Sequence, residues 1–314
     1  MNILITGASG YIGNYLSNYL YKKKEFNLFL INKKKHIKNK NKTNTFYLDI
    51  NDKNIDWDIN LKKIDIVIHL AATQHKIFKN QKSNIYLSTN SNSVGKLIYH
   101  CIKNDVKKFI YLSSIKVNGE KTLKNTTFSY SDKPNPKTIY AKSKYLGEQE
   151  LKKMFNNEKT EIYILRIPLV YGHKPKGYLS IFSNFIKKGY PIPLKGFKNN
   201  LRSYISIYNL NEFIYHVIKY NHNNTGVYLL SDKDDYSTYD FLYQFSKTIT
   251  DKSKFIYIPK FIIKSILFLT FNNHIYERLN NSLRIDSQTT YKIFNWNPKY
   301  NLKDTIDIIN NDIN

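Results

Sequence analysis

The chain has 314 residues, enough for one large domain or two modest ones. Hydrophobic residues make up 41% of it and aromatic residues 15%, which supplies a buried core and excludes a disordered chain. Lys and Arg number 49 against 24 Asp and Glu, for a net charge of +25. Only four of these cations are arginines, and Lys, Asn, Ile and Tyr, all abundant here, share A/T-rich codons. We therefore attribute much of the charge to codon bias rather than to a nucleic-acid partner.

The cysteine content and the N-terminus predict a cytoplasmic protein. A single cysteine, Cys101, excludes an intramolecular disulfide framework and a cysteine metal cluster. Met1 leads directly into a strand-like segment, without the basic lead-in of a secretory signal. The longest apolar stretch, 261–271, is too short and too interrupted to span a bilayer. We expect a core helix there, with an interfacial helix as the alternative.

Short β-rich runs alternate with helical periodicity over residues 1–168, which predicts an α/β fold with a doubly wound parallel sheet. The expected strands are Ile3–Thr6, Leu28–Asn32, Phe46–Leu48, Ile64–His69, Lys108–Ser113 and Ile162–Ile167. The expected helices are Tyr11–Lys23, Tyr86–Asn104 and Thr138–Phe155, in which apolar residues recur at three- and four-residue spacing.

Glycine and proline become frequent after residue 168, and we place a domain boundary there. We expect Tyr204–Ile207, a helix at Leu210–Tyr220 and Val227–Leu230 to return to the edge of the sheet. The first domain is then 1–168 with about 204–230. A smaller, interleaved C-terminal domain comprises 169–203 and 231–314.

A glycine-rich turn follows the first expected strand. Gly7, Gly10 and Gly13 have a GxxGxxG spacing between that strand and the first helix. They permit a tight turn, close approach of the backbone to a pyrophosphate and close packing of helix on strand. Because helix N-terminal amides attract anions, the turn with Tyr11 and Ile12 predicts a dinucleotide site.

The residue at the end of the second strand normally distinguishes the two dinucleotides, since a carboxylate there bonds the ribose and repels a 2′-phosphate. Asn32 occupies this position and is followed by Lys33, Lys34 and Lys35, so both NAD and NADP stay open. Asp49 and Ile50, after the third strand, are expected to contact the adenine.

Tyr140 and Lys144 are four residues apart at the start of a helix and share one face. An ammonium near a phenol favours the phenolate, so Lys144 is expected to activate Tyr140 as an acid/base group. Ser113 and Ser114 end an apolar strand, where ligands bind in parallel sheets.

Together these segments resemble the extended short-chain dehydrogenase/reductase family, in its NAD-dependent epimerase/dehydratase branch acting on nucleotide sugars. The resemblance rests on TGASGYIG at 6–13, HLAA at 69–72, Asn90, SSIKVNG at 113–119, YAKSK at 140–144, LRIPLVYG at 165–172, LRSYISIYNL at 201–210, YERLNNSL at 276–283 and RID at 284–286. It implies a Rossmann-type sheet with a nucleotide-sugar domain.

The resemblance also implies roles for individual residues. Ser114 and Tyr140 bond the sugar oxygen that is oxidised or reduced, and Tyr140 moves its proton while a hydride passes to or from the nicotinamide. The implied cofactor-binding residues are Gly7, Gly10, Tyr11, Ile12, Gly13, Asn32, Asp49, Ile50, Leu70, Ala71, Ala72, Asn90, Ser113, Tyr140, Lys144, Ile167 and Pro168. The implied substrate-binding residues are Ser114, Lys116, Asn118, Tyr140, Lys176, Arg202 and Arg278.

The two arginines in that set suit a diphosphate, because a guanidinium makes paired hydrogen bonds that lysine cannot. Arg202 and Arg278 are the positions that grip the diphosphate in the family. Arg166 is expected to brace the nicotinamide side, and Arg284 to be structural. Asn118 replaces a tyrosine common in the family.

The family contains several reactions, and the sequence favours a UDP-sugar 4-epimerase, of the UDP-glucose or UDP-N-acetylhexosamine type, for surface polysaccharide precursors. A 4,6-dehydratase is disfavoured, because Ile115-Lys116 stands where that branch has an Asp-Glu acid/base pair. A UDP-4-keto-6-deoxyhexosamine 4-reductase using NADPH is the alternative, and a non-catalytic redox sensor or scaffold is another. We expect a homodimer through the helices at 86–104 and 138–155 and no nucleic-acid partner. Membrane association, with a lipid-linked substrate, stays open as a minor alternative.

Overall fold

The computed structural model describes residues 1–33, 44–52, 54–73, 86, 88–157, 159–220, 223–250 and 252–311. Lys34 and Lys35, the two later residues of the expected basic stretch, lie outside the described residues. The described chain divides into two compact units, the first comprising 1–119, 133–167 and 211–229 and the second 120–132, 168–210 and 230–314.

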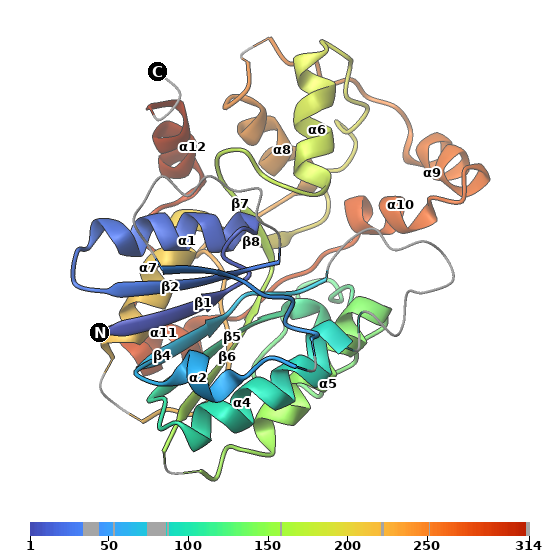
Figure 1. The fold of residues 1–314 in the computed structure, drawn as a ribbon. Coiled ribbons are helices and arrows are strands. Elements are labelled where there is room, and N and C mark those ends of the chain that lie inside the picture. Colours follow the sequence, from blue (N-terminus) through green and yellow to red (C-terminus); the bar gives the residue numbers. More distant parts are fainter. Residues whose placement is uncertain are drawn as a thin grey trace. The chain divides into compact units, whose positions relative to one another are not determined.

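The first unit is built on a seven-stranded sheet whose pairings are all parallel, in the order β3-β2-β1-β4-β5-β6-β9 (Figure 1). The strands are β1 (Asn2–Thr6), β2 (Asn27–Asn32), β3 (Asn44–Tyr47), β4 (Ile66–His69), β5 (Lys108–Ser114), β6 (Glu161–Ile167) and β9 (Gly226–Leu229). Central strands such as β4 are buried along their whole length, as expected when both faces are covered. The predicted α/β class with a doubly wound parallel sheet is confirmed.

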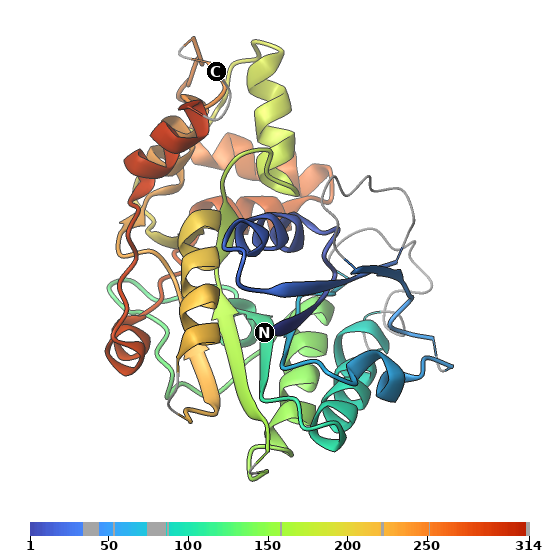
Figure 2. The ribbon, with the colours of Figure 1, turned by 60° about the vertical axis from the view of Figure 1, so that its left-hand side comes forward.

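Helices cover both faces of this sheet (Figures 1 and 2). On one face α2 (Trp57–Leu61), α4 (Ser93–Lys103) and α5 (Ile139–Lys152) bury their apolar sides in a common core with the strands. On the other face lie α1 (Tyr11–Lys22) and α7 (Ile207–Lys219). The expected helix at 86–104 is in fact a π-helical turn, Ser88–Asn92, continued by α4.

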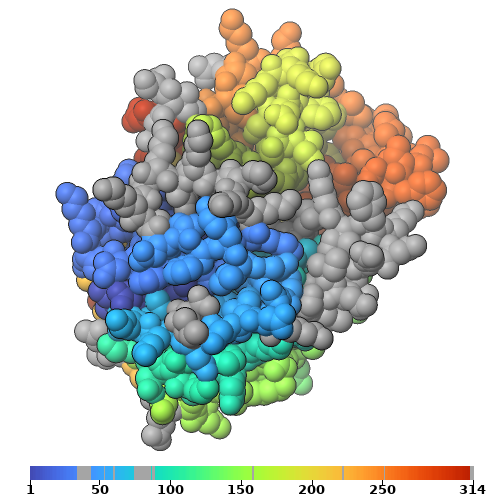
Figure 3. All heavy atoms as spheres, viewed as in Figure 1, coloured from blue at the N-terminus to red at the C-terminus, as the bar shows by residue number. Residues whose placement is uncertain are grey.

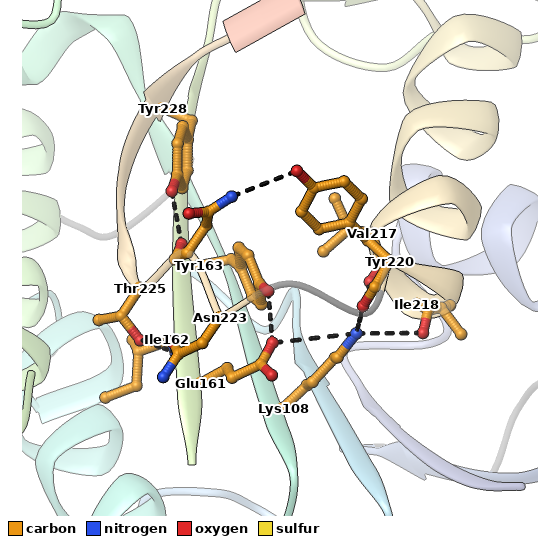
Figure 4. A network of polar contacts seen from close by, with 11 residues as sticks. Lys108, Glu161, Ile162, Tyr163, Val217, Ile218, Tyr220, Asn223, Thr225 and Tyr228 are labelled. Atoms are coloured by element: carbon orange, nitrogen blue, oxygen red, sulfur yellow. Dashed lines mark hydrogen bonds and ion pairs between the residues drawn. The ribbon is translucent and has the colours of Figure 1, made fainter. Parts of the chain in front are cut away.

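A polar network ties the C-terminal end of α7 to the sheet (Figure 4). The Lys108 ammonium, buried at the start of β5, donates to the carbonyls of Val217 at 3.1 Å and Ile218 at 3.4 Å, and also to that of Tyr220. The Glu161 carboxylate lies 3.9 Å from it. Burial lowers the pKa of Lys108, which Glu161 partly offsets. Lys108 thus satisfies carbonyls that the helix itself leaves open and fixes α7 on the sheet.

The second unit contains a three-stranded sheet in the order β10-β8-β7. Its strands are β7 (Leu169–Tyr171), β8 (Arg202–Ser206) and β10 (Asp235–Tyr236). Its helices are α6 (Tyr178–Lys187), α8 (Thr238–Ser246), α9 (Lys260–Leu269), α10 (Asn273–Asn280), α11 (Gln288–Phe294) and α12 (Leu302–Asn311).

The expectation that Tyr204–Ile207 returns to the large sheet is wrong. These residues belong to β8 and the start of α7, and β8 pairs with β7. The Tyr204 ring stacks on Phe241 with centroids 3.7 Å apart and meets the edge of Tyr171 at 6.4 Å. This aromatic core of the second unit, rather than the sheet edge, buries the strand. Val227–Leu230 does return, as β9 against β6.

The expectation of a core helix at 261–271 is also wrong. Of the residues of α9, Ile263 alone is fully buried, while most of the other apolar side chains are exposed. The sequence is apolar enough for a core, but the unit packs only one side of the helix. Among the described residues no helix combines the length and the apolarity needed to cross a bilayer.

Candidate active site

The glycine turn joins β1 to α1 at the carboxyl edge of the large sheet. Gly7 has φ +70°, a left-handed conformation that glycine adopts without steric cost, and its amide donates to the Ile31 carbonyl at 3.0 Å. Gly10 is the N-cap of α1 and makes no side-chain cap hydrogen bond. The amides of the first turn of α1 therefore have no intrahelical acceptor and suit an anion.

The turn is packed so closely that side chains are excluded from it. A Cβ on Gly13 would lie 2.3 Å from the Gly7 carbonyl oxygen and 2.7 Å from Ala8 Cα. A Cβ on Gly7 would lie 2.7 Å from Ala71 Cα, in the segment that follows β4. The Leu70 amide donates to the Thr6 carbonyl at 3.2 Å, which holds this segment beside the turn. The spacing noticed in the sequence is therefore required by the backbone.

The end of β2 offers a buried acceptor. Asn32 is 2% exposed, and its Oδ1 has no hydrogen-bond partner among the described residues. Lys33 pairs with Asp49, Nζ to Oδ2, at 2.8 Å. Partial burial opposes ionisation of Asp49, but Lys33 and the Asn51 amide outweigh it and hold the pKa of Asp49 below its usual value. The unsatisfied amide oxygen of Asn32 fits a ligand hydroxyl, while the charge of Lys33 is already engaged.

α5 carries Tyr140 and Lys144 one helical turn apart. Thr138 caps the helix, its hydroxyl accepting from the Ala141 amide at 3.2 Å. Lys144 is 2% exposed, and its Nζ donates to the Leu112 carbonyl of β5 at 2.8 Å and lies 4.5 Å from the centre of the Tyr111 ring. Burial lowers the pKa of Lys144 to about 7, against the opposing charge of Glu148. Lys144 is thus fixed against the end of β5.

The two serines that end β5 have different surroundings. The Ser113 hydroxyl is buried and donates to Glu148 Oε1 at 2.5 Å. Ser114 is partly exposed and is the N-cap of the short 3-10 helix Ile115–Val117, where its Oγ accepts from the Lys116 amide at 3.3 Å. Ser114, not Ser113, therefore has a hydroxyl hydrogen available for a ligand.

A buried ion pair lies beneath these serines. Arg166 of β6 donates to Glu148 of α5, Nε to Oε1 at 3.0 Å and Nη2 to Oε2 at 2.6 Å, with both side chains at most 2% exposed. Its Nη1 donates to the Asn118 Oδ1 at 2.9 Å. The pair therefore anchors Ser113 and Asn118, the two ends of the SSIKVN segment.

The Asn90 amide links three elements of the first unit. Its Oδ1 accepts from the Thr73 amide at 3.0 Å, and its Nδ2 donates to the Ser143 hydroxyl at 2.9 Å. A Cβ on Gly147 would lie 2.3 Å from the Asn90 carbonyl oxygen, so α5 approaches the π-helical turn closely. Asn90 thereby sets the position of α5, and with it that of Tyr140.

The second unit brings together two of the predicted arginines. Arg278 of α10 lies over the Tyr178 ring of α6, with Cζ 5.6 Å from its centre. Burial raises the pKa of Tyr178, against the positive charges of Arg202 and Arg278. Arg202 Nη1 donates to the Asn281 carbonyl at 2.7 Å, which orients its guanidinium. Arg278 thus covers the partly buried Tyr178 ring, and the charge of Arg202 also acts on its phenol.

The other predicted cations differ in their surroundings. Lys176 is exposed just before α6, and Lys116 is partly exposed. Arg284 pairs with Asp235, Nε to Oδ2, at 2.7 Å, as a structural residue would. In the part of the chain that the structure describes, no three His, Cys, Asp or Glu side chains are grouped to hold a metal ion. Cys101 is buried, which raises the pKa of its thiol.

The model of the NAD dependent epimerase/dehydratase family matches residues 3–230, from β1 through the glycine turn, Tyr140 and Lys144 to β9. The chain belongs to this family. Its resemblance to the epimerase/dehydratase branch is thereby confirmed.

Individual relatives support the same assignment. The UDP-glucose 4-epimerase of Vibrio cholerae is 28% identical over 305 residues, 96% of this chain and 92% of that protein. The N-acetyl-alpha-D-glucosaminyl-diphospho-ditrans,octacis-undecaprenol 4-epimerase of Escherichia coli O157:H7 is 26% identical over 82% of this chain and 75% of its own length. The crystal structure of UDP-glucuronic acid 4-epimerase from Bacillus cereus in complex with NAD has the same fold, with TM-score 0.79, 21% identity and coverage of 98% and 96%.

Three residues of the site did not emerge from the sequence. Glu148 follows Lys144 by one more helical turn, a spacing that places it on the same face of α5. Tyr178 directly follows the Pro-Lys-Gly segment and carried no signal beyond its position. His69 ends β4 buried and uncharged, its Nδ1 paired with the Thr6 hydroxyl at 2.9 Å, and burial lowers its pKa to about 3.

Proposed function

We propose that this chain is a UDP-sugar 4-epimerase that keeps NAD bound through the whole catalytic cycle. The observation that carries the proposal is the fixed position of Lys144, buried one helical turn from Tyr140 and bonded to the end of β5 beside Ser114. Membership of the family and the relation to the Vibrio cholerae UDP-glucose 4-epimerase over 96% of the chain support it.

The first unit has features that suit NAD. The glycine turn and the N-terminus of α1 would take the pyrophosphate, and the unsatisfied Oδ1 of Asn32 would accept from a ribose hydroxyl. Because Lys33 is paired with Asp49, its charge is already neutralised, which favours NAD over NADP. Leu70–Ala72, Ile50, Ile167 and Pro168 are proposed to line the rest of the site.

The proposed chemistry is oxidation of the sugar at its 4-position followed by reduction from the other face. Bound NAD supplies a reversible hydride acceptor. Tyr140 as phenolate takes the proton of the 4-hydroxyl, and Ser114 holds the same oxygen with its free hydrogen. The Lys144 ammonium favours the phenolate, and the phenolate in turn raises the pKa of Lys144 from its buried value. After the keto sugar has turned, Tyr140 returns the proton to the alkoxide.

We propose that Arg202 and Arg278 bind the diphosphate of the substrate. Arg278 lies over the Tyr178 ring, the Asn281 carbonyl orients Arg202, and both positive charges oppose the rise in the pKa of Tyr178. A guanidinium suits a diphosphate because it makes paired hydrogen bonds. Lys116, Asn118 and Lys176 are proposed as further substrate contacts.

The test is incubation of the purified protein with UDP-glucose, and in parallel with UDP-N-acetylglucosamine, without added cofactor. We expect conversion to the 4-epimer, measured by ¹H NMR of the anomeric proton, and NAD in the supernatant of the heat-denatured protein. Activity seen only with a 4-keto sugar and added NADPH would identify the reductase instead. Bound NAD without any turnover would identify the sensor or scaffold.

A second candidate function is the same epimerisation on a sugar that is carried by a polyprenyl diphosphate instead of by UDP. The Escherichia coli relative is named for a sugar on a diphospho-undecaprenol, whose diphosphate presents the same charge to Arg202 and Arg278 as that of UDP. Ser114, Tyr140 and Lys144, which are proposed to act at the 4-position of the sugar, would do so in the same way on either carrier. Running the same assay with polyprenyl-diphospho-N-acetylglucosamine distinguishes them, since turnover confined to this substrate would exclude the UDP-sugar.

We propose a homodimer that works in the cytoplasm, with α4 and α5 at the interface. Tyr99 on α4 and Leu146 on α5 are large apolar side chains left 57% and 41% exposed. The two helices pack side by side, so these residues belong to one continuous helical layer. Sedimentation velocity is expected to give a dimer for the native protein and a monomer for the Tyr99→Glu/Leu146→Glu variant. A native monomer would contradict the interface.

A further inference from the structure

Most apolar side chains of α9, together with Phe271 just after it, are exposed on the second unit. Six of them, called here the α9 face, are exposed: Phe261, Ile262, Ile266, Phe268, Leu269 and Phe271. Phe268 is 68% exposed, Leu269 75% and Phe271 94%. The orange atoms of this part of the chain lie at the surface in the space-filling view (Figure 3). So many large apolar groups in one short segment mark an interaction surface.

The α9 face is one continuous side of the helix. Since successive residues are rotated by about 100°, the five members within α9 fall in an arc of roughly 160°. On the opposite side Ile263 and Leu267 pack into the core of the unit. In an ordinary surface helix the apolar side faces the core and the polar side faces solvent. In α9 only Ile263 and Leu267 face the core, and the wider apolar side faces solvent.

The charges of the chain segment that carries the α9 face are almost all positive. Residues 252–281 contain Lys252, Lys254, Lys260, Lys264 and Arg278 against a single acidic residue, Glu277. Lys252, Lys254 and Lys264 are exposed, whereas Lys260 donates to Asn280 Oδ1 at 2.9 Å. An exposed apolar surface in a segment whose exposed charges are mainly ammonium groups complements a surface that is both apolar and anionic.

That complementarity selects the occupant. A second copy docking through the same face would bring its own lysines against these and repel them. A lipid bilayer with anionic headgroups offers acyl chains to the phenylalanines and phosphates to the lysines. The length of α9, 10 residues, is far below the roughly 20 that span a bilayer, so the helix can only lie in the interface.

We propose that the α9 face docks on an anionic membrane surface, with α9 parallel to the bilayer and its lysines against the lipid phosphates. The chain is thereby a peripheral membrane protein. The sequence favoured a core helix for the same stretch and kept an interfacial helix as the alternative, and the exposure of the α9 face favours that alternative.

Co-sedimentation with vesicles tests this. We expect the purified protein to pellet with vesicles of phosphatidylcholine and phosphatidylglycerol in a 3:1 ratio, and far less with phosphatidylcholine alone. The Phe261→Ser/Phe268→Ser/Phe271→Ser variant keeps every lysine, and we expect it to partition at least about tenfold more weakly. The matched control, Ile181→Ser/Phe185→Ser/Tyr190→Ser, removes three apolar side chains of similar exposure on and after α6 and should bind as the native protein does.

Three outcomes would overturn the proposal. Equal binding by the α9 variant would mean that net charge alone attracts the protein, and equal loss in the α6 control would mean general adhesion. An oligomer in gel filtration that the α9 variant dissociates would assign the face to a second copy. Vesicle binding is measured without substrate, so its result is independent of the proposed reaction.

A spectroscopic readout locates the face in the bilayer. The two tryptophans of the chain, Trp57 and Trp296, are buried, so Phe271→Trp introduces an exposed one. Its emission is expected to shift to the blue on vesicle binding and to be quenched by brominated acyl chains. Leu123→Trp, at a position 75% exposed outside the α9 face, should respond to neither. Absence of quenching at position 271 would contradict insertion.

Discussion

Replacing Tyr140 by Phe is expected to lower kcat on the UDP-sugar by about 10²–10⁴-fold while leaving NAD bound. The change removes a single oxygen, the one that moves the proton of the 4-hydroxyl, and keeps the ring and its packing in α5. Tyr140 is only one of the implied cofactor contacts, and the glycine turn, Asn32 and Leu70–Ala72 keep theirs. The stoichiometry of NAD should therefore not fall by more than a small fraction. Turnover gives the first quantity, and NAD released on denaturation gives the second.

Tyr145→Phe is the matched control for this experiment. It removes the same oxygen from a partly buried tyrosine five residues along the same helix, next to Lys144 but on another side of α5. We expect native turnover from it. Unchanged turnover in Tyr140→Phe would refute the assignment of Tyr140, and an equal loss in both variants would trace the effect to the helix rather than to the phenol.

Removing the carboxylate of Glu148 is expected to lower the free energy of unfolding by about 3–5 kcal/mol, because it leaves the Arg166 guanidinium buried without a counter-charge. Glu148 is fully buried and accepts from Arg166 through both carboxylate oxygens and from Ser113 as well. The Glu148→Ala variant should therefore unfold at a temperature lower by about 10 °C, measured by differential scanning calorimetry.

Two further variants separate a buried pair from an ordinary one. Glu148→Leu/Arg166→Leu removes both charges, so we expect it to lower the free energy of unfolding by less than the sum of the losses in the two single variants. Glu150 lies two residues after Glu148 and pairs with Lys153 at the surface. We expect Glu150→Gln, which breaks this pair, to change the free energy of unfolding by no more than about 0.5 kcal/mol. A loss in Glu148→Ala no larger than that of Glu150→Gln would show that the buried pair contributes little.

Local pattern was enough to predict the elements of the first unit. The strands at 3–6, 28–32, 108–113 and 162–167 lie within or overlap β1, β2, β5 and β6, and α1 and α5 begin within one residue of their predicted starts. These segments have strong periodicity, and the strands are covered on both faces, so sequence and burial agree. The glycine turn was predictable because part of its spacing is a local requirement: a Cβ on Gly13 would lie 2.3 Å from the carbonyl oxygen of Gly7.

Contacts between distant segments decided the rest. Ser113 and Ser114 are neighbours with identical side chains, and only Glu148, reaching β5 from α5, engages one and leaves the other available. The partner of Arg166 is likewise 18 residues away in the chain, so its pairing carries no spacing signal.

The sequence by itself determined the glycine turn and the Tyr140 and Lys144 pair, because each depends on residues within a few positions of one another. The order of such motifs along the chain determined the family. The tertiary structure decided that β8 joins the small sheet and that α9 presents its apolar side outward. Both outcomes depend on which other part of the chain packs against the apolar surface in question. An apolar pattern predicts that a side chain is stabilised by burial, but it does not predict which surface buries it. In α9, Ile263 and Leu267 are the residues that pack into the core of the second unit.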